Sequence, residues 1–391
     1  MKRILVAVAL GCTAIAQGLA QAPVSERLKV GLLATLSGPP AALGQQARNG
    51  FELALKDLGG KLGGRDIDLV VQDDELKPDV GVGKARTLVE REKVAFVVGP
   101  TFSNILGAVM RPITAGGAIL ISPNAGPSSS AGKDCNPNFF VTSYQNDQVH
   151  EVLGHYAQDA GIKRAFIIAP NYQAGRDALA GFKRDFRGEV VDEAYVPLNQ
   201  LDYAAELSKI AAARPDAIFA FLPGGMGVNF VKQFRQAGLA ESVKFLSAFT
   251  VDETNLPAQG DAALGFFSGS NWAPNLDVAA NHRFVAAYER AYGAVPASYA
   301  FHAYDAALLI DSALRSTGGD VSNKDALRAA LRRAEFSSLR GAFRFNTNQY
   351  PIQDFYLVKV AKRPDGKLQT EVVQKVFANY ADTYAKDCPL R

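Results

Sequence analysis

The chain has 391 residues, of which 48% are hydrophobic and 21% are charged, a composition typical of globular proteins. One hydrophobic core seldom serves so many residues, so the length predicts two domains. The formal net charge is only +3 and acids stand among the basic residues, as in 86–93, which argues against a protein that binds nucleic acid or an anionic membrane surface.

The N-terminus has the pattern of a secretory signal peptide. Two basic residues at 2–3 precede an apolar run over 4–16, and small residues at 18–20 suit cleavage after Ala20. The apolar run is too short for a membrane span. We therefore expect residues 1–20 to be removed and the mature protein to lie in the periplasm. A buried N-terminal helix is the alternative.

The cysteine count changes with this cleavage. Cys12 is removed with the signal peptide, so that Cys135 and Cys388 remain. An even pair in an oxidising compartment predicts one disulfide, which would tie the C-terminal tail, residues 381–391, to a loop in the first half of the chain. Two unrelated buried thiols are the alternative.

The first half of the chain alternates short apolar strands with amphipathic helices. Strands are expected at 29–33, 67–71, 94–98 and 118–121, and helices at 47–58, 79–92 and 103–115. Continuous apolar strands between helices are typical of a parallel sheet that helices cover on both faces.

The same alternation starts again after Asp147. Helices are expected at 148–160, 174–185, 203–213, 227–237, 277–292 and 298–315, and strands at 164–169, 190–195, 217–222 and 244–246. Two such runs predict an α/β protein of two Rossmann-like, doubly wound lobes. Because the late helices need a sheet to cover, we expect the chain to cross between the lobes near Asn271 and Gln353. The expected lobes are 28–143 with 273–352, and 144–272 with 353–380.

Small and polar residues follow the carboxyl ends of the expected strands. These strand ends are 35–39, 99–104, 122–126, 171–175, 223–227 and 248–250. Ligands of open α/β sheets bind in a crevice at these ends, and helices that begin there offer free amides and a positive dipole end to a carboxylate. Ser103 is placed to cap its helix and also to bond a ligand. Each turn taken alone is explained by ordinary strand–helix connection chemistry.

Motifs of catalysis and metal binding are missing from the sequence. It contains no H-E-x-x-H, C-x-x-C or G-x-S-x-G, and the glycines at 224–227 lack the lysine of a phosphate loop. His150 and His155 are five residues apart, so they do not share a helix face as metal ligands. Residues 73–75 are acidic and could hold a cation, although a solvated turn is favoured. We expect no enzyme, no cofactor and no metal.

Four segments together resemble the periplasmic branched-chain-amino-acid-type binding proteins of ABC importers, the type I "Venus flytrap" receptors. They are KVGLLATLSGPPAALGQQARNGFELAL (29–55), LVVQDDELKPDVGVGKARTLVEREKVAFVVGP (69–100), ILISPNAG (119–126) and AYDAALLIDSAL (303–314). The resemblance extends over nearly the whole mature chain. It implies two Rossmann-like lobes joined by three crossovers, a ligand in the cleft between them, and closure that an inner-membrane permease senses.

The resemblance also implies site residues. The family's carboxylate clamp matches Ser103 and the turn of Asn124, Ala125 and Gly126. Leu43 stands where the family often has an aromatic residue, and Phe249 stands where the amino-acid binders have the acid that receives the ligand's ammonium. A tyrosine of the second lobe is replaced near Pro223, and the adjacent Gly224 is also expected at the site.

A buried ammonium without a carboxylate partner costs several kcal/mol, so Phe249 argues against an amino-acid ligand. Aromatic residues expected near the cleft suggest an aromatic-walled pocket: Phe102, Tyr144, Tyr172, Phe249 and Trp272. The segments NYQAG (171–175) and SNWAPNLD (270–277) also look like subfamily members that bind aromatic acids.

We therefore expect a monomeric transport protein for an organic acid such as a benzoate, phenylacetate or hydroxycinnamate. An amino-acid or amide binder with other polar contacts is one alternative. A receptor that signals to a sensor and feeds no permease is another.

Overall fold

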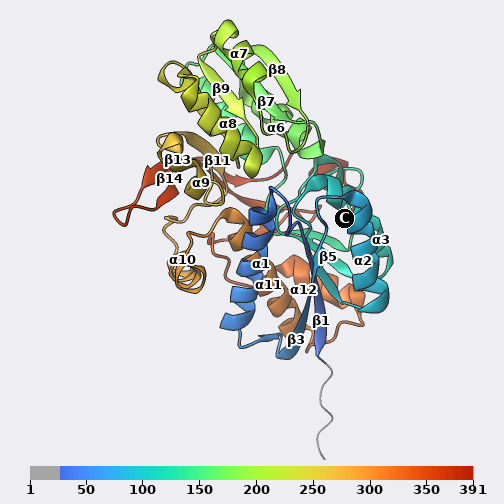
Figure 1. The fold of residues 1–391 in the computed structure, drawn as a ribbon. Coiled ribbons are helices and arrows are strands. Elements are labelled where there is room, and N and C mark those ends of the chain that lie inside the picture. Colours follow the sequence, from blue (N-terminus) through green and yellow to red (C-terminus); the bar gives the residue numbers. More distant parts are fainter. Residues whose placement is uncertain (1–26, 391) are drawn as a thin grey trace, which may run out of the picture.

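The structure is a computed structural model that describes residues 27–390 and folds them into two lobes (Figure 1). The predicted signal peptide, with Cys12, lies outside the described residues. We keep 28–143 with 273–352 and 144–272 with 353–380 as the proposed limits of lobe 1 and lobe 2. No helix in the described part of the chain is both long and apolar enough to span a membrane.

A six-stranded sheet forms the centre of lobe 1. In sheet order its strands are β2 (Lys61–Leu62), β3 (Arg65–Asp73), β1 (Leu28–Ala34), β4 (Phe96–Val98), β5 (Ile119–Ser122) and β6 (Phe139–Val141). All neighbours pair in parallel except β2 with β3. β4, β5 and β6 are buried along their whole length, which explains their unbroken apolar sequences. The sequence prediction omitted the short strands β2 and β6.

Helices cover this sheet on both faces (Figure 1). They are α1 (Ala41–Asp57), α2 (Pro78–Arg86), the π turn η1 (Thr87–Arg91), α3 (Ser103–Ala115), α4 (Ser128–Ala131), α10 (Ala279–Tyr292), α11 (Ser298–Ser316) and α12 (Lys324–Arg333). The prediction of a single α-helix at 79–92 is wrong in one respect. The α-helix α2 ends at Arg86, and the residues that follow, Thr87–Arg91, form a π turn. The prediction omitted α12. α1 and α11 approach closely at Gly50, where a Cβ atom would lie 2.0 Å from the carbonyl oxygen of Ala300.

The second sheet belongs mainly to lobe 2. In sheet order its strands are β12 (Arg344–Phe345), β13 (Pro351–Lys362), β11 (Phe267–Ser270), β10 (Lys244–Ser247), β9 (Ala217–Ala220), β7 (Arg164–Pro170) and β8 (Glu189–Val196), and β14 (Leu368–Tyr380) pairs with β13. β12, at its edge, lies within the residue range of lobe 1. The helices of lobe 2 are α5 (Gln148–Asp159), α6 (Gln173–Asp185), α7 (Ala204–Ala213), α8 (Gly225–Gln236) and α9 (Leu256–Gln259), with the 3₁₀ turns η2 (Leu239–Glu241) and η3 (Gly260–Ala263). A last 3₁₀ turn, η4 (Ala385–Asp387), lies in the C-terminal tail. The sequence prediction omitted the β13–β14 hairpin, because much of β14 is polar and partly exposed.

The chain crosses between the lobes three times: after β6, after β11 and in the first residues of β13. The crossovers are hydrogen-bonded to one another at buried side chains. The Asn271 amide donates to the Ser143 carbonyl (3.2 Å) and to Gln353 Oε1 (3.0 Å), and Gln353 Nε2 donates to the same Ser143 carbonyl (2.7 Å). The fold class is therefore confirmed as two Rossmann-like, doubly wound lobes joined by a three-crossover hinge.

The structure contains the predicted disulfide. Cys135, in the loop after α4, is bonded to Cys388, which directly follows η4, with a Cα–Cα distance of 5.7 Å. The bond ties the C-terminal tail to lobe 1 across 253 residues of sequence. Cysteine residues in an oxidising compartment pair in this way when the fold brings them close.

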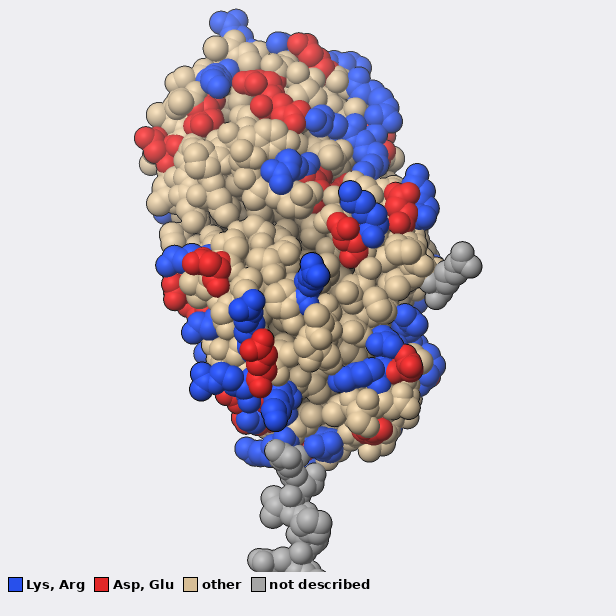
Figure 2. Space-filling view, turned by 90° about the vertical axis from the view of Figure 1, so that its right-hand side faces the viewer, with Lys and Arg blue, Asp and Glu red and all other residues tan. Residues whose placement is uncertain are grey.

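The surface carries no field of a single sign on the face that Figure 2 shows. Basic and acidic side chains stand on both lobes, and an uncharged area lies at mid-height on the left of this face. This distribution agrees with the small net charge of the chain.

Candidate ligand-binding site

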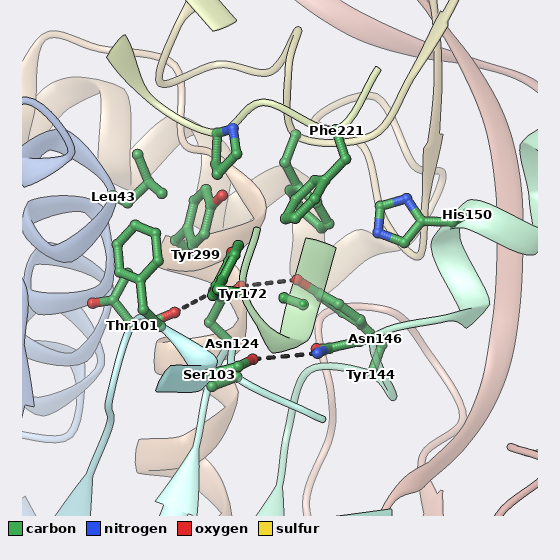
Figure 3. Close-up of a pocket in the computed structure, with 15 residues that line it drawn as sticks. Leu43, Thr101, Ser103, Asn124, Tyr144, Asn146, His150, Tyr172, Phe221 and Tyr299 are labelled. Carbon is green, nitrogen blue, oxygen red and sulfur yellow. Dashed lines mark hydrogen bonds between the residues drawn. The ribbon is translucent and has the colours of Figure 1, made fainter. Parts of the chain in front are cut away.

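A narrow, partly open cavity lies between the two lobes. Its lining is Leu43, Thr101, Phe102, Ser103, Asn124, Ala125, Tyr144, Asn146, His150, Tyr172, Ala174, Phe221, Pro223, Phe249 and Tyr299. Figure 3 shows Leu43 and Thr101 at one end and His150 at the other. Turns at the carboxyl ends of strands in both lobes supply many of these residues, as expected for an open α/β sheet.

Eight of the residues predicted from the sequence lie together around this cavity. They are Leu43, Phe102, Ser103, Asn124, Ala125, Tyr144, Tyr172 and Phe249. That they bind a ligand remains a proposal, developed below. The prediction missed Thr101, Asn146, His150, Ala174, Phe221, Pro223 and Tyr299.

Two predicted glycines lie beside the cavity and do not line it. Gly126 packs against the first crossover, where a Cβ atom would lie 2.1 Å from the Tyr144 carbonyl oxygen. Gly224 has a φ of 64°, and a Cβ atom there would lie 3.3 Å from the Cα atom of Pro40. Both therefore permit close backbone contact, Gly126 with the crossover and Gly224 across the rim where the lobes meet.

Trp272, also predicted as a site residue, does not line this cavity. It follows the second crossover and enters the core of lobe 1, where it is 1% exposed. Its ring stacks on Phe301 at 5.2 Å, and its Nε1 donates to Asn281 Oδ1 at 2.7 Å. A buried tryptophan with its N–H satisfied in this way is a core residue.

Ser103 begins α3, and the structure corrects one expectation about it. The N-cap residue is Phe102, and no side chain caps the helix. Instead, Asn146 Nδ2 donates to Ser103 Oγ (3.2 Å) and to Asp177 Oδ2 (2.9 Å), and Asn146 Oδ1 accepts from the Gly126 amide (3.0 Å). Because Ser103 Oγ is an acceptor in this bond, its own O–H can donate into the cavity. Asn146 was missed because it lies in a crossover, in the polar run 145–148.

Next to Ser103, two main-chain amides are available to an anion. The N–H of Ala125 and the N–H of Ser103, at the start of α3, have no hydrogen-bond partner among the described residues. The neighbouring Asn124 side chain is already held, since it donates to the Thr101 carbonyl (2.6 Å) and accepts from Tyr144 Oη (2.9 Å). Amides at a helix N-terminus together with a serine hydroxyl form a donor set that suits a carboxylate.

Aromatic rings form the other walls. Tyr144 stacks on Phe249 at 5.3 Å, and Tyr172 stacks on Phe221 at 6.3 Å. Tyr299 lies 5.9 Å from Phe249. Phe249 has a φ of 58°, an unusual conformation for a bulky residue, which costs on the order of 1–3 kcal/mol. Flat, apolar walls of this kind suit a planar ring.

The cavity lining carries no formal charge at neutral pH. None of the lining residues is Asp, Glu, Lys or Arg. Burial raises the pKa of Tyr144, Tyr172 and Tyr299 above the ordinary tyrosine value, so their hydroxyls stay protonated. Burial lowers the pKa of His150 to about 3, so its imidazole is neutral. A ligand's charge can thus be met only by hydrogen-bond donors and acceptors.

In the acidic turn at 73–75, the carboxylates of Asp73 and Asp74 accept hydrogen bonds from neighbouring protein groups. Asp73 Oδ1 accepts from the amides of Leu36 and Glu75, each at 2.9 Å, and Asp74 Oδ1 accepts from Thr35 Oγ1 at 2.6 Å. Over residues 27–390, no group of three or more His, Cys, Asp or Glu side chains is arranged to hold a metal ion.

The two lobes touch across the cleft. Asp177, on α6 of lobe 2, accepts hydrogen bonds from the amide (3.2 Å) and the hydroxyl (2.8 Å) of Ser128 in lobe 1. Asp177 also accepts from Asn146, so this contact between the lobes is joined to the Ser103 hydroxyl by a continuous set of hydrogen bonds. Hydrogen bonds therefore link Ser103 to the contact between the lobes.

Two doubly wound lobes, a triple crossover and a cavity between the lobes define a two-lobed ligand-binding protein. The chain belongs to the periplasmic binding protein family, which it matches over residues 27–367. It is a periplasmic solute-binding protein of an ABC transporter, as its relatives are.

Both sequence relatives and solved structures resemble it over almost the whole chain. The Leu/Ile/Val-binding protein homolog 6 of Brucella melitensis is 30% identical over 380 residues, which are 94% of this chain and 96% of that protein. An ABC-transporter solute-binding protein from R. palustris in complex with benzoate has a TM-score of 0.88 and 33% identity, covering 93% of this chain and 100% of the other. A second R. palustris protein, in complex with 4-hydroxybenzoate, has a TM-score of 0.85 and 29% identity, covering 91% and 98%.

Proposed function

We propose that this protein binds a single-ring aromatic carboxylate in the cleft between its lobes and delivers it to an inner-membrane ABC permease. The carboxylate accepts hydrogen bonds from the Ser103 amide, the Ser103 hydroxyl and the Ala125 amide. The ring lies among Tyr144, Tyr172 and Phe249.

The observation that carries this proposal is the absence of a carboxylate from the cavity lining. An amino-acid ligand brings an ammonium group, and burying it without an acidic partner costs several kcal/mol. A cation–π contact with a ring such as Phe249 would offset only about 0.5–2 kcal/mol of this. An organic acid without an ammonium group has no such cost.

The comparisons support the two candidate ligands unequally. The relative of 30% identity is named for leucine, isoleucine and valine, whereas the solved structures of 33% and 29% identity hold benzoate and 4-hydroxybenzoate. Leucine is therefore the competitor to test. The neutral, ring-lined cavity supports the aromatic acid.

A thermal-shift panel separates these ligands. Benzoate at about 100 times its dissociation constant is expected to stabilise the protein by about 2.7 kcal/mol, a shift that the assay detects easily. Leucine is expected to cause no shift. Tight binding of leucine with no response to any aromatic acid would reject the proposal.

Ser103→Ala removes one hydroxyl donor from the expected carboxylate site. We expect benzoate binding, measured by isothermal titration calorimetry, to weaken by about 1–3 kcal/mol, as for a hydrogen bond to a charged group. Ser208→Ala, which changes an exposed serine of α7, is the matched control and is expected to leave the affinity unchanged. An unchanged affinity in Ser103→Ala would remove Ser103 from the site.

A further inference from the structure

His150 is a buried polar group that the proposed carboxylate site leaves unused. It lies in the first turn of α5, at the start of lobe 2, and is 2% exposed. Its Nδ1 is buried without a hydrogen-bond partner among the described residues. A buried polar group without a partner is costly and uncommon, so it calls for an explanation.

The surroundings of His150 supply no such partner from the protein. Its ring makes edge contacts with three phenylalanines: Phe221 at 5.0 Å, Phe219 at 5.6 Å and Phe249 at 6.4 Å. His150 lines the cavity, and Figure 3 shows its ring turned toward the cavity, well apart from Ser103 and Thr101. The imidazole is therefore the polar group that His150 brings to this end of the cavity.

The proposed function determines where each end of a ligand lies. A ring held by its carboxylate at Ser103 and Ala125 extends away from these residues, toward the end where His150 lies. A neutral imidazole has one N–H donor and one bare nitrogen acceptor, and a hydroxyl both donates and accepts, so a hydroxyl can pair with either ring nitrogen. A ring C–H can do neither.

We propose that His150 is a specificity residue that hydrogen-bonds a hydroxyl group on the ring of the bound aromatic acid, opposite the carboxylate, and so selects hydroxylated over unsubstituted benzoates. This inference rests on the proposed function, because it takes the carboxylate position from it. The asymmetry of such sites is known: a buried polar group left unpaired by the wrong ligand discriminates more strongly than a lost apolar contact.

The test is a comparison of two acids by isothermal titration calorimetry. Wild-type protein is expected to bind 4-hydroxybenzoate about tenfold more tightly than benzoate, the typical contribution of one buried hydrogen bond. His150→Phe is expected to bring this ratio close to one, because it lowers the affinity for 4-hydroxybenzoate more than the affinity for benzoate. His150→Asn, which keeps a donor and an acceptor, is expected to preserve part of the preference and serves if the phenylalanine variant does not fold.

His155→Phe is the matched control. His155 lies on the same helix, and its side chain is 41% exposed and outside the cavity lining. We expect this variant to bind both acids as the wild type does. Its unchanged ratio would show that the loss in His150→Phe comes from the cavity.

The outcomes separate the two proposals. Wild-type protein that binds neither acid overturns both the proposed function and the role of His150. Wild-type protein that binds benzoate at least as tightly as 4-hydroxybenzoate overturns the role of His150 alone. A preference that survives unchanged in both His150 variants has the same consequence.

Discussion

Replacing Arg340 with methionine is expected to lower the free energy of unfolding by about 3–5 kcal/mol, the usual cost of breaking a buried ion pair. The Arg340 side chain is 3% exposed, and its guanidinium lies 3.2 Å from Asp305, whose side chain is fully buried. Burial lowers the pKa of Arg340 to about 10, which still leaves it charged at neutral pH. Without it, the Asp305 carboxylate would keep only the Ser338 hydroxyl and the Leu339 amide as donors.

Arg340 also holds the hinge together. It donates to the carbonyls of Thr142 and Ser143 in the first crossover and to Gln353 in the third. The expected loss of stability therefore includes the joint between the lobes as well as the ion pair. Urea denaturation followed by circular dichroism measures it.

Two further variants make this prediction specific. Arg333→Met removes an exposed arginine paired with Glu335, and it is expected to cost at most about 1 kcal/mol. Arg340→Met combined with Asp305→Asn is expected to be more stable than Arg340→Met alone, since no unpaired charge is left buried. A double variant no more stable than the single one would show that the ion pair is not the source of the loss.

The second large effect concerns pH. Asp252 is buried next to the aromatic wall, and its Oδ2 has no partner in the described part of the chain. Burial raises the pKa of Asp252 from its ordinary value of 3.8 to about 7, although the hydrogen bonds from Thr254 act to lower it. The folded protein thus holds this proton more tightly than the unfolded chain does. The stability that Asp252 contributes is full below about pH 4 and is lost as the pH rises through 7.

Asp252→Asn removes this titration. We expect the variant to gain stability relative to the wild type as the pH rises from 4 to 7, by up to about 4 kcal/mol, with no further gain above that range. Denaturation curves of both proteins at pH 4, 5.5, 7 and 8 give the difference directly. Asp261→Asn, at an exposed position, is the control and is expected to shift by less than about 1 kcal/mol over the same range. A constant difference between Asp252→Asn and the wild type would contradict the prediction.

Periodicity in the sequence was enough to predict most of the fold. Buried parallel strands such as β4 and β5 are continuous apolar runs, and helices such as α3 carry one apolar face, so both can be recognised locally. The β13–β14 hairpin could not be recognised in this way. Its stability comes from pairing between two strands, and β14 alternates too irregularly to show a buried face.

The residues around the cavity show the same difference between what local sequence patterns predict and what they do not. Ser103, Ala125 and Phe249 could be predicted, because turns at strand ends are visible in the sequence and their place in the family is known. His150 and Asn146 could not be, because the crossover and the first turn of α5 have no local signal of facing a cavity. The contact of Asn146 with Ser103 joins residues 43 positions apart.

The sequence by itself determined the class of protein: two α/β lobes with a cysteine pair. These properties follow from local patterns of polarity, from residue types and from the resemblance to a known family. Only the tertiary structure decided which aromatic residues form the cavity. In the structure, Trp272 lies in the core of lobe 1, and His150 and Tyr299 line the cavity. Burial depends on where distant segments meet, and no local pattern contains that information.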